Sequence, residues 1–265
     1  MTLFQSIVLG IIEGITEFLP ISSTAHLIIA ADWLKIPDSP SLKSFLISIQ
    51  LGAILSVAVL YAKKLIKEPK LILKIAAAFI PTSIIGLAAY SLVKNYLMES
   101  LTLIASALIV GGIALIIMER YFARREKTRS ETVTEPEQKL SDLSYRQAAL
   151  IGVFQTMAIV PGVSRSAATI MGGLSLGVSR KNIVEFSFLL ALPTMAAATF
   201  LDLYKEPPVL SGQELIIWSV GLVVAFITAV LGIKFFLRYI QKNNFVPFGW
   251  YRIAIGLVIF AWPWL

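Results

Sequence analysis

Hydrophobic residues fall into long runs along the chain, most of about 17 to 24 residues, and a helix needs about 20 such residues to cross a bilayer core. Inside a bilayer the backbone groups must pair internally, which leaves helices or a closed barrel. The runs lack the two-residue alternation of barrel strands. The pattern predicts an all-α, polytopic helical membrane bundle. The apolar stretches are 3–19, 22–34, 43–62, 71–93, 100–118, 145–160, 165–178, 183–203, 214–237 and 250–265.

Proline interrupts two pairs of these stretches. Pro20 separates the first stretch from the second, and Pro161-Gly162 separates the sixth from the seventh. Both pairs are too short and too broken to form two full crossings each. We therefore expect two re-entrant helical hairpins, because a break at membrane depth is tolerated only where it is buried in protein or lines a polar cavity.

Lys and Arg residues gather in four short segments, 63–74, 119–146, 180–181 and 238–242. Loops rich in Lys and Arg stay in the cytoplasm. With these segments inside, the chain makes six full spans and both termini lie outside. The first hairpin then enters from the outer face and the second from the inner face.

Two hairpins that enter from opposite faces are typical of an inverted repeat. In both hairpins a glycine precedes an acid or amide by three residues, and a serine follows that residue by nine. These residues are Gly10, Glu13 and Ser22 in the first hairpin and Gly152, Gln155 and Ser164 in the second. We expect one integral membrane domain, 1–265, with pseudo-repeats of about 1–118 and 145–265 joined by a cytoplasmic loop, 119–144.

Composition removes several classes of function. Hydrophobic residues make up 57% of the chain and charged residues 15%, which is very unlike a soluble domain. The formal net charge is +7, and the basic residues lie beside apolar runs. Their position indicates membrane lipids rather than nucleic acid as a partner. The chain has no Cys and one His, which excludes disulfides, thiolate catalysis and His-rich metal sites. Two glutamates in the first run argue against a cleavable signal peptide.

The first hairpin carries two acids and a group of hydroxyls. Glu13 and Glu17 lie four residues apart, on one helical face, and two carboxylates in a membrane need a cation or a shared proton. A bound divalent cation or a cationic partner explains the two carboxylates better than a position of both glutamates at the membrane interface does. After Pro20 come Ser22, Ser23, Thr24 and His26. On a helix His26 would reach either serine, which suits a hydroxyl with a base, or a His nucleophile.

The second hairpin carries an arginine just after its break. Free N–H groups at a helix start, hydroxyls of Ser164, Ser166 and Thr169, and the Arg165 guanidinium would form an anion cradle. Gln155 lies ahead of the break. Together the two hairpins predict a membrane pocket for a phosphate ester or anhydride with a lipid tail, where acids hold a metal and Arg165 neutralises charge on the transferred phosphoryl group.

The chain resembles the bacitracin-resistance family of undecaprenyl-diphosphate phosphatases. The resemblance rests on EGITEFLPISSTAH at 13–26 and PGVSRSAAT at 161–169, and it continues through 49–55, 179–193 and 245–256. Ala25 and Ala167 stand where the family usually has glycine. The resemblance implies hydrolysis of undecaprenyl diphosphate to undecaprenyl phosphate and phosphate, which recycles the cell-wall lipid carrier. It also implies a divalent cation, Mg²⁺ or Ca²⁺, and a pocket open to the outer, periplasmic face of the plasma (inner) membrane.

The resemblance also implies roles for individual residues. Glu13 and Glu17 would bind metal or diphosphate, with Ser23 and His26 as nucleophile and acid/base partner and Arg165 gripping the phosphates. Ser23, His26 and a metal-activated water remain open as the nucleophile. The substrate-binding residues are expected to be Ser22, Thr24, Ser164, Ser166, Thr169 and Gln155.

The alternative to a phosphatase is a transporter or flippase of a polyprenyl phosphate lipid, because paired hairpins also build transporters. Release of inorganic phosphate would distinguish a phosphatase from a transporter or flippase. The oligomeric state stays open, with a homodimer among the alternatives.

Overall fold

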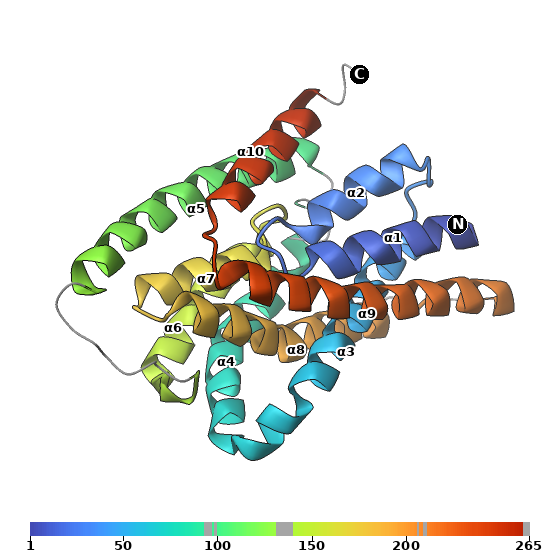
Figure 1. Cartoon of the computed structure of the whole chain (residues 1–265). Coiled ribbons are helices and arrows are strands. Elements are labelled where there is room, and N and C mark those ends of the chain that lie inside the picture. The colour runs from blue at the N-terminus through green and yellow to red at the C-terminus, as the bar shows by residue number, and fades with distance from the viewer. Residues whose placement is uncertain (93–96, 98–99, 131–139, 206, 209–210, 262–265) are drawn as a thin grey trace.

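A computed structural model of the chain describes residues 1–92, 97, 100–130, 140–205, 207–208 and 211–261. Every regular element within these residues is a helix (Figure 1), so the all-α prediction is confirmed. The elements in chain order are α1 (Leu3–Thr16), α2 (Ser23–Trp33), α3 (Pro40–Lys67), α4 (Pro69–Leu92), α5 (Leu101–Ser130), η2 (Leu140–Asp142), α6 (Tyr145–Gln155), η3 (Thr156–Ile159), α7 (Arg165–Ser175), α8 (Arg180–Lys205), α9 (Gly212–Ile240) and α10 (Val246–Ala261).

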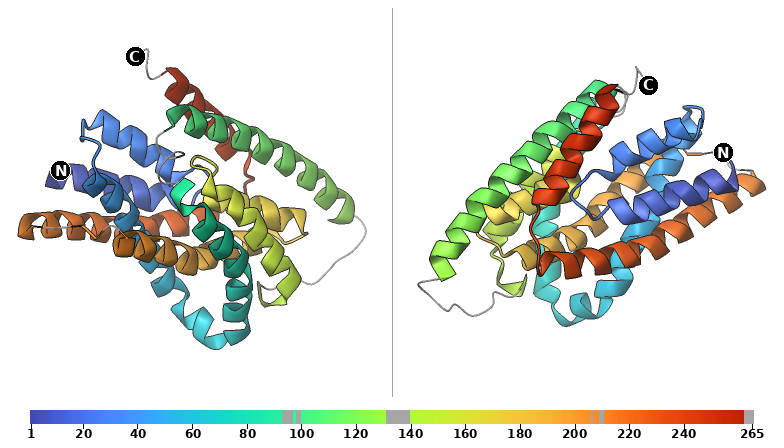
Figure 2. Two further views of the ribbon diagram at one scale, coloured as in Figure 1. Left: turned by 180° about the vertical axis from the view of Figure 1, so that it is seen from behind. Right: turned by 45° about the horizontal axis from the view of Figure 1, so that its top comes forward.

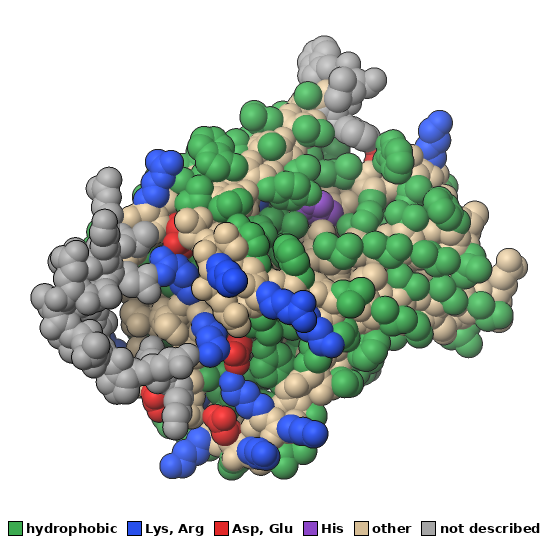
Figure 3. Space-filling view, viewed as in Figure 1, with side chains coloured by type: hydrophobic (Ala, Val, Ile, Leu, Met, Phe, Trp, Pro, Cys, Tyr) green, Lys and Arg blue, Asp and Glu red, His purple; other side chains and the backbone are tan. Residues whose placement is uncertain are grey.

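Five helices of the described chain, α3, α4, α5, α8 and α9, are long and apolar enough to cross a membrane. They match five of the six full spans that the hydrophobic pattern predicts. The sixth predicted span, 250–265, corresponds to α10, a shorter apolar helix of 16 residues in the described part. Hydrophobic side chains cover most of the face in Figure 3, as expected of a multi-pass membrane protein.

Each of the two short helix pairs breaks at the proline that the sequence singles out. α1 gives way at Thr16 to a turn that contains Pro20, and α7 begins after Pro161 and Gly162. At both restarts a serine has a positive φ, 70° at Ser22 and 73° at Ser164, which is uncommon for a residue other than glycine. The two breaks therefore share a sharp reversal immediately before the second helix.

The two pairs also share their outer ends. Thr2 forms a capping box with Gln5, and the Gln5 Nε2 donates to the carbonyl oxygen of Leu34 at 3.1 Å. Ser144 forms the same capping box with Gln147, whose Nε2 donates to the carbonyl oxygen of Leu176, also at 3.1 Å. Each glutamine therefore ties the start of the first short helix to the end of the second, at the same sequence separation in both halves.

Close helix contacts hold each pair in place. α1 packs along α9, whereas α6 packs against α4 (Figures 1 and 2). A Cβ at Gly14 would meet the Ala225 carbonyl oxygen of α9, and a Cβ at Gly152 would meet the Ala78 carbonyl oxygen of α4. Glycine at these positions lets two backbones approach closely, which is how membrane helices gain packing energy.

α5 and α10 form a third packed pair, antiparallel to one another (Figure 2). α5 continues as far as Ser130, so the expected loop at 119–144 begins later than the hydrophobic pattern predicts. Helix-forming charged residues extend the helix beyond its apolar part. Residues 131–139 of that predicted loop lie outside the described residues.

Basic side chains gather at the end of the molecule where α3 meets α4 (Figure 3). Two ion pairs lie among them. Lys64 Nζ lies 2.6 Å from Glu185 Oε2, and Arg180 Nη2 lies 2.7 Å from Glu119 Oε1. Glu185 therefore pairs with Lys64 at this end of the molecule.

Candidate active site

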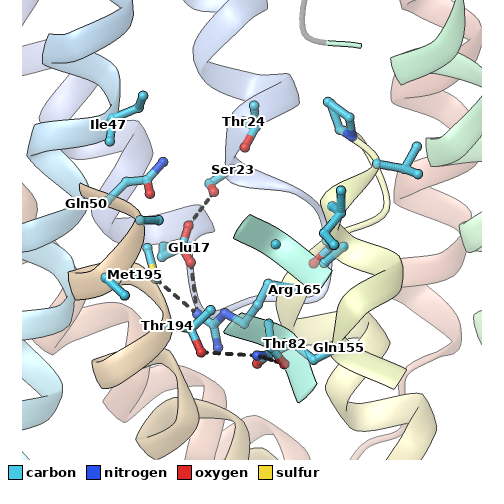
Figure 4. A pocket seen from close by; sticks show the side chains of 18 of the residues that line it. Glu17, Ser23, Thr24, Ile47, Gln50, Thr82, Gln155, Arg165, Thr194 and Met195 are labelled. Atoms are coloured by element: carbon cyan, nitrogen blue, oxygen red, sulfur yellow. Dashed lines mark hydrogen bonds and ion pairs between the residues drawn. The ribbon is translucent and has the colours of Figure 1, made fainter. Parts of the chain in front are cut away.

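A cavity of about 360 Å³ lies between the two helix breaks and the middle of the bundle. It is lined by the two breaks, by α3 and α4, and by α8. Much of the wall is apolar, and polar side chains from both breaks and from α3, α4 and α8 project into the cavity (Figure 4). The polar lining residues are Glu17, Ser22, Ser23, Thr24, Gln50, Thr82, Ser83, Gln155, Ser164, Arg165, Thr194 and Asp202.

Three of these side chains form a continuous chain of contacts (Figure 4). The Ser23 hydroxyl donates to Glu17 Oε2 at 2.5 Å, and Arg165 Nη2 lies 2.8 Å from Glu17 Oε1. The side chains of Glu17 and Arg165 are only 7% and 11% exposed, so the ion pair is largely shielded from solvent. The structure thus brings Ser23, Glu17 and Arg165 together, as the sequence predicted for one shared pocket.

Arg165 is anchored on its other side by α8. Its Nη1 donates to the Ser187 carbonyl oxygen at 2.8 Å and to the Ser187 Oγ at 3.2 Å. The guanidinium also lies 5.8 Å from the centre of the Phe18 ring. Its Nε–H has no acceptor within the described part of the chain. Arg165 is therefore held rigidly and keeps one buried donor for a ligand.

The two helix starts at the breaks differ. In α7 the Ser164 hydroxyl accepts a hydrogen bond from the Ala167 N–H at 3.2 Å, which caps that helix. In α2 the Ser22 side chain makes no capping hydrogen bond. The first N–H groups of a helix lack internal partners, so the start of α2 keeps donors for an anion. Ser22, Ser23 and Thr24 of α2 line the cavity.

Two hydroxyls of the predicted anion cradle serve the fold instead. Ser166 donates to the Phe18 carbonyl oxygen at 2.9 Å, which joins α7 to the first break. Thr169 donates to the Arg165 carbonyl oxygen at 2.8 Å. Neither residue lines the cavity. The expectation of direct anion contact is corrected for both, because their positions on α7 point them into the protein interior.

His26 also lies elsewhere than expected. Its Nδ1 is 2.7 Å from the Ser22 carbonyl oxygen, and its Nε2 is 2.8 Å from the Tyr251 hydroxyl of α10. The His26 and Tyr251 rings are stacked, with centroids 5.5 Å apart. Both ring nitrogens are therefore engaged away from Ser23, whose hydroxyl is bonded to Glu17. The expected Ser23–His26 pair is replaced by a Ser23–Glu17 pair.

Glu13 is fully buried behind Glu17 and does not line the cavity. Neither of its carboxylate oxygens accepts a hydrogen bond from a donor group in the residues that the structure describes. The Glu17 carboxylate lies within hydrogen-bonding reach of it, so the two acids need a shared proton or a cation between them. An unpartnered buried carboxylate is costly, and a bound cation would satisfy it, so the donors here fit a divalent metal.

The carboxylates of Glu13 and Glu17 fit a metal ion that also binds the substrate. Within the described chain, no three acidic or histidine side chains cluster closely enough to hold a metal ion by themselves. Mg²⁺ is commonly bound by one or two carboxylates together with water and substrate phosphates. Glu13 and Glu17 provide that number.

A hydroxyl–amide network that the sequence reasoning missed closes the inner wall of the cavity. Gln155 Nε2 donates to Thr82 Oγ1 at 3.0 Å and to Thr194 Oγ1 at 3.1 Å (Figure 4). Gln155 therefore lies in the lining of the cavity, held by two threonines that were not expected, and its contact with substrate stays a prediction. Each threonine directly follows a proline within a helix, and this repeated Pro-Thr pair is a signal that could have revealed it.

Known proteins resemble this chain over nearly its whole length. Residues 6–258 match the family described as "Bacitracin resistance protein BacA". A protein of Aquifex aeolicus named undecaprenyl-diphosphatase is 47% identical over 264 residues, covering 98% of each chain. A protein of Sulfurihydrogenibium with the same name is 46% identical, covering 99% of this chain and 100% of its own. One of Bdellovibrio bacteriovorus, again so named, is 46% identical over 98% of this chain.

Proposed function

The chain belongs to the bacitracin resistance family, and on this premise we propose that it is a membrane phosphatase that hydrolyses undecaprenyl diphosphate to undecaprenyl phosphate and phosphate. The reaction recycles the lipid carrier of cell-wall polymers. The contact chain of Ser23, Glu17 and Arg165 in one largely apolar cavity is the observation that carries this function, since it combines a nucleophile, a base and an anion clamp beside room for a lipid.

Ser23 is the nucleophile in this proposal, and Glu17 is its base. The Ser23 Oγ attacks the terminal phosphorus while Glu17 Oε2 takes the hydroxyl proton, for which a separation of 2.5 Å is within reach. The bond from that phosphorus to the bridging oxygen breaks, and undecaprenyl phosphate leaves as an anion. Water then attacks the phosphorus of the seryl phosphate, the bond from that phosphorus to Ser23 Oγ breaks, and the Glu17 carboxyl returns its proton to Oγ. The proton lost by the attacking water leaves with inorganic phosphate.

Arg165 stabilises the charge that gathers on the phosphoryl oxygens during both steps. Its contact with the Ser187 carbonyl oxygen fixes the guanidinium before substrate arrives, which is the requirement for electrostatic catalysis. The uncapped start of α2 adds backbone donors next to Ser23. Together they accept a phosphate group whose charge would be costly inside a membrane.

A divalent cation, Mg²⁺ or Ca²⁺, is held in this proposal by Glu13 and Glu17. When bound, it neutralises phosphate charge and orients the terminal phosphoryl group. The unpartnered oxygens of Glu13 support this assignment. The carboxylate of Glu17 then has two duties, because it faces Ser23 with one oxygen and Arg165 with the other.

The topology that suits this reaction has six full spans, two re-entrant hairpins and an inverted repeat of about 1–118 and 145–265. The matching capping boxes, glutamine ties and positive-φ serines of the two hairpins support the repeat. The basic end at α3 and α4 marks the cytoplasmic side, so the first hairpin enters from outside. The cavity then opens to the outer, periplasmic face of the plasma membrane.

Release of inorganic phosphate from undecaprenyl diphosphate by the purified protein in detergent tests the function. We expect turnover that stops with a chelator and returns with Mg²⁺ or Ca²⁺. The paired broken helices favour one second candidate, a transporter of polyprenyl phosphate lipids. Movement of the headgroup across liposomes without phosphate release would replace the phosphatase by that transporter.

A further inference from the structure

Arg252 of α10 is the largest fully buried side chain of the described residues, with no exposed surface. Every hydrogen bond that its guanidinium makes goes to a backbone carbonyl oxygen. The acceptors are Pro20 at 3.2 Å and Val163 at 2.8 Å for Nη1, Ala107 at 3.2 Å and Gly162 at 3.0 Å for Nη2, and Leu108 at 3.4 Å for Nε.

These acceptors come from both helix breaks and from α5. Pro20 lies shortly before Ser23, and Gly162 and Val163 lie shortly before Arg165. One guanidinium therefore holds the chain just ahead of the nucleophile and just ahead of the phosphate clamp. The carbonyls of Ala107 and Leu108, in the first third of α5, accept from the same guanidinium, so the two breaks share one fixed point on α5.

The residue before Arg252 adds a second tie to the first break. The Tyr251 hydroxyl contacts His26 Nε2 at 2.8 Å, and His26 Nδ1 contacts the Ser22 carbonyl oxygen at 2.7 Å. Two neighbouring residues of α10 thus hold the chain on either side of the reversal at Ser22. The reversal has a positive φ and needs such support, because strained backbone persists only where its surroundings over-determine it.

Arginine suits this position and lysine does not. The guanidinium is planar, always charged and carries five N–H donors in a fixed fork, which matches several carbonyls arriving from different directions. A lysine carries three donors on a flexible stem. Gly111 of α5 leaves room for the guanidinium because it has no side chain. A Cβ at this position would collide with Arg252 Nη2.

We propose that Arg252 is a positioning residue that sets the separation between the two helix breaks and thereby aligns Ser23 and Glu17 with Arg165. It touches neither the substrate nor the reacting atoms; Arg252 does not line the cavity. The effect on turnover rests on the proposed phosphatase function, whereas the effect on the separation of the two breaks does not.

The kinetic test compares Arg252→Gln and Arg252→Lys with the wild type. Misplacement by about 1 Å can cost about a hundredfold in rate, so we expect kcat to fall about a hundredfold in Arg252→Gln and about tenfold in Arg252→Lys. KM stays within about threefold, because the groups that bind the phosphates remain present. Arg180→Lys, which alters the Arg180–Glu119 pair at the other end of the bundle, is the control and keeps wild-type kcat.

Gly111→Ala keeps Arg252 but displaces its guanidinium. This variant therefore tests the proposal if the Arg252 variants do not fold. Gly256→Ala is its matched control. The added methyl meets Ile109 and the Ala105 carbonyl oxygen in the same α5–α10 contact, without reaching the guanidinium. Both variants lose thermal stability, and only Gly111→Ala loses kcat by tenfold or more. Equal kcat in the two variants would overturn the inference.

A distance measurement tests the inference without activity. The chain has no cysteine, so Trp33→Cys on α2 and Met157→Cys on η3, at exposed positions, accept one spin label each. We expect a narrow distance distribution in the otherwise wild-type protein and in Gly256→Ala, and a shifted or broader one in Arg252→Gln and Gly111→Ala. An unchanged distribution would overturn the inference. Inactive wild-type protein with the expected distance changes would instead overturn only the phosphatase function.

Discussion

Arg165 Nη2 lies 2.8 Å from Glu17 Oε1, although the two residues are 148 positions apart in the chain. The pair joins the second helix break to the first, and it places a guanidinium beside the carboxylate that accepts the Ser23 hydroxyl. Because both side chains are largely shielded, loss of either leaves a charge that neither water nor protein fully satisfies.

Arg165→Ala is expected to lower kcat by about a thousandfold, since removal of one preorganised oxyanion donor alone costs about a hundred- to a thousandfold. Arg165→Lys keeps the charge but loses the fork that spans Glu17 and Ser187, so we expect it to recover only part of the rate. Release of inorganic phosphate measures both. Turnover near that of the wild type in Arg165→Ala would contradict the site assignment.

Ser23 should become phosphorylated during turnover. Rapid acid quenching with substrate labelled at the terminal phosphate should leave label on the protein, and the label should survive acid, as expected of a phosphoserine. Ser23→Ala should abolish it. Label that is lost in acid but survives base would indicate a phosphohistidine and move the nucleophile to His26, and turnover of Ser23→Ala near wild type would favour an attacking water.

Glu17→Gln should keep the shape of the site while removing the base. We expect kcat to fall by about a hundredfold or more, because proton transfer by a positioned group contributes about 10²- to 10⁴-fold. The Ser23 hydroxyl keeps an oxygen acceptor, so the fold should persist, but the thermal unfolding temperature should fall because the shielded Arg165 loses its counter-charge. Single-turnover label transfer at the wild-type rate in this variant would exclude Glu17 as the base.

Glu13→Gln should separate metal binding from catalysis. The carboxylate is fully buried and has no partner among the described groups, so its removal is expected to leave stability unchanged or higher in a chelator. The concentration of Mg²⁺ or Ca²⁺ needed for half-maximal activity should rise about tenfold, as for loss of one of two protein ligands. Thermal unfolding with and without metal provides a second readout. The same metal stabilisation in wild type and Glu13→Gln would argue against ligation by Glu13.

Gly14→Val should weaken the α1–α9 contact. The new side chain meets the backbone of α9 at Ala225 and Ala229, and overpacking of this kind costs about 1–3 kcal/mol. Gly212→Ala is the control, because a Cβ there meets nothing within 4 Å. Thermal unfolding in detergent should show a lower transition for Gly14→Val alone. Equal transitions would show that α1 and α9 are not in close contact in the membrane protein.

Much of the architecture could be predicted because a bilayer imposes rules that act along the chain. Apolar length identified α3, α4, α5, α8 and α9 as membrane-crossing helices. Pro20 and the Pro161-Gly162 pair marked the two breaks because each divides an apolar stretch into pieces too short for two crossings. Proline by itself does not mark a break, since Pro81 and Pro193 lie inside α4 and α8. The acids, hydroxyls and arginine beside those breaks stood out because each is costly in an apolar setting without a function.

The side-chain directions could not be predicted in the same way. Spacing placed His26 within reach of Ser23, yet the packing of α10 against α2 turns its ring to Tyr251. Ser166 and Thr169 stand in the same motif as Arg165, but their faces of α7 meet the protein interior. Rotation of a helix about its axis depends on which neighbours it meets, and no local pattern contains that information.

The sequence by itself determined that this is a helical membrane protein with two helix breaks that carry polar and charged residues. Helix length and the cost of buried polar groups are properties of single segments. Tertiary structure alone decided that Glu17 joins Ser23 to Arg165 and that Arg252 holds both breaks at one point. Those relationships link segments far apart in the chain. They arise only when the packing of α5, α8 and α10 brings the breaks together.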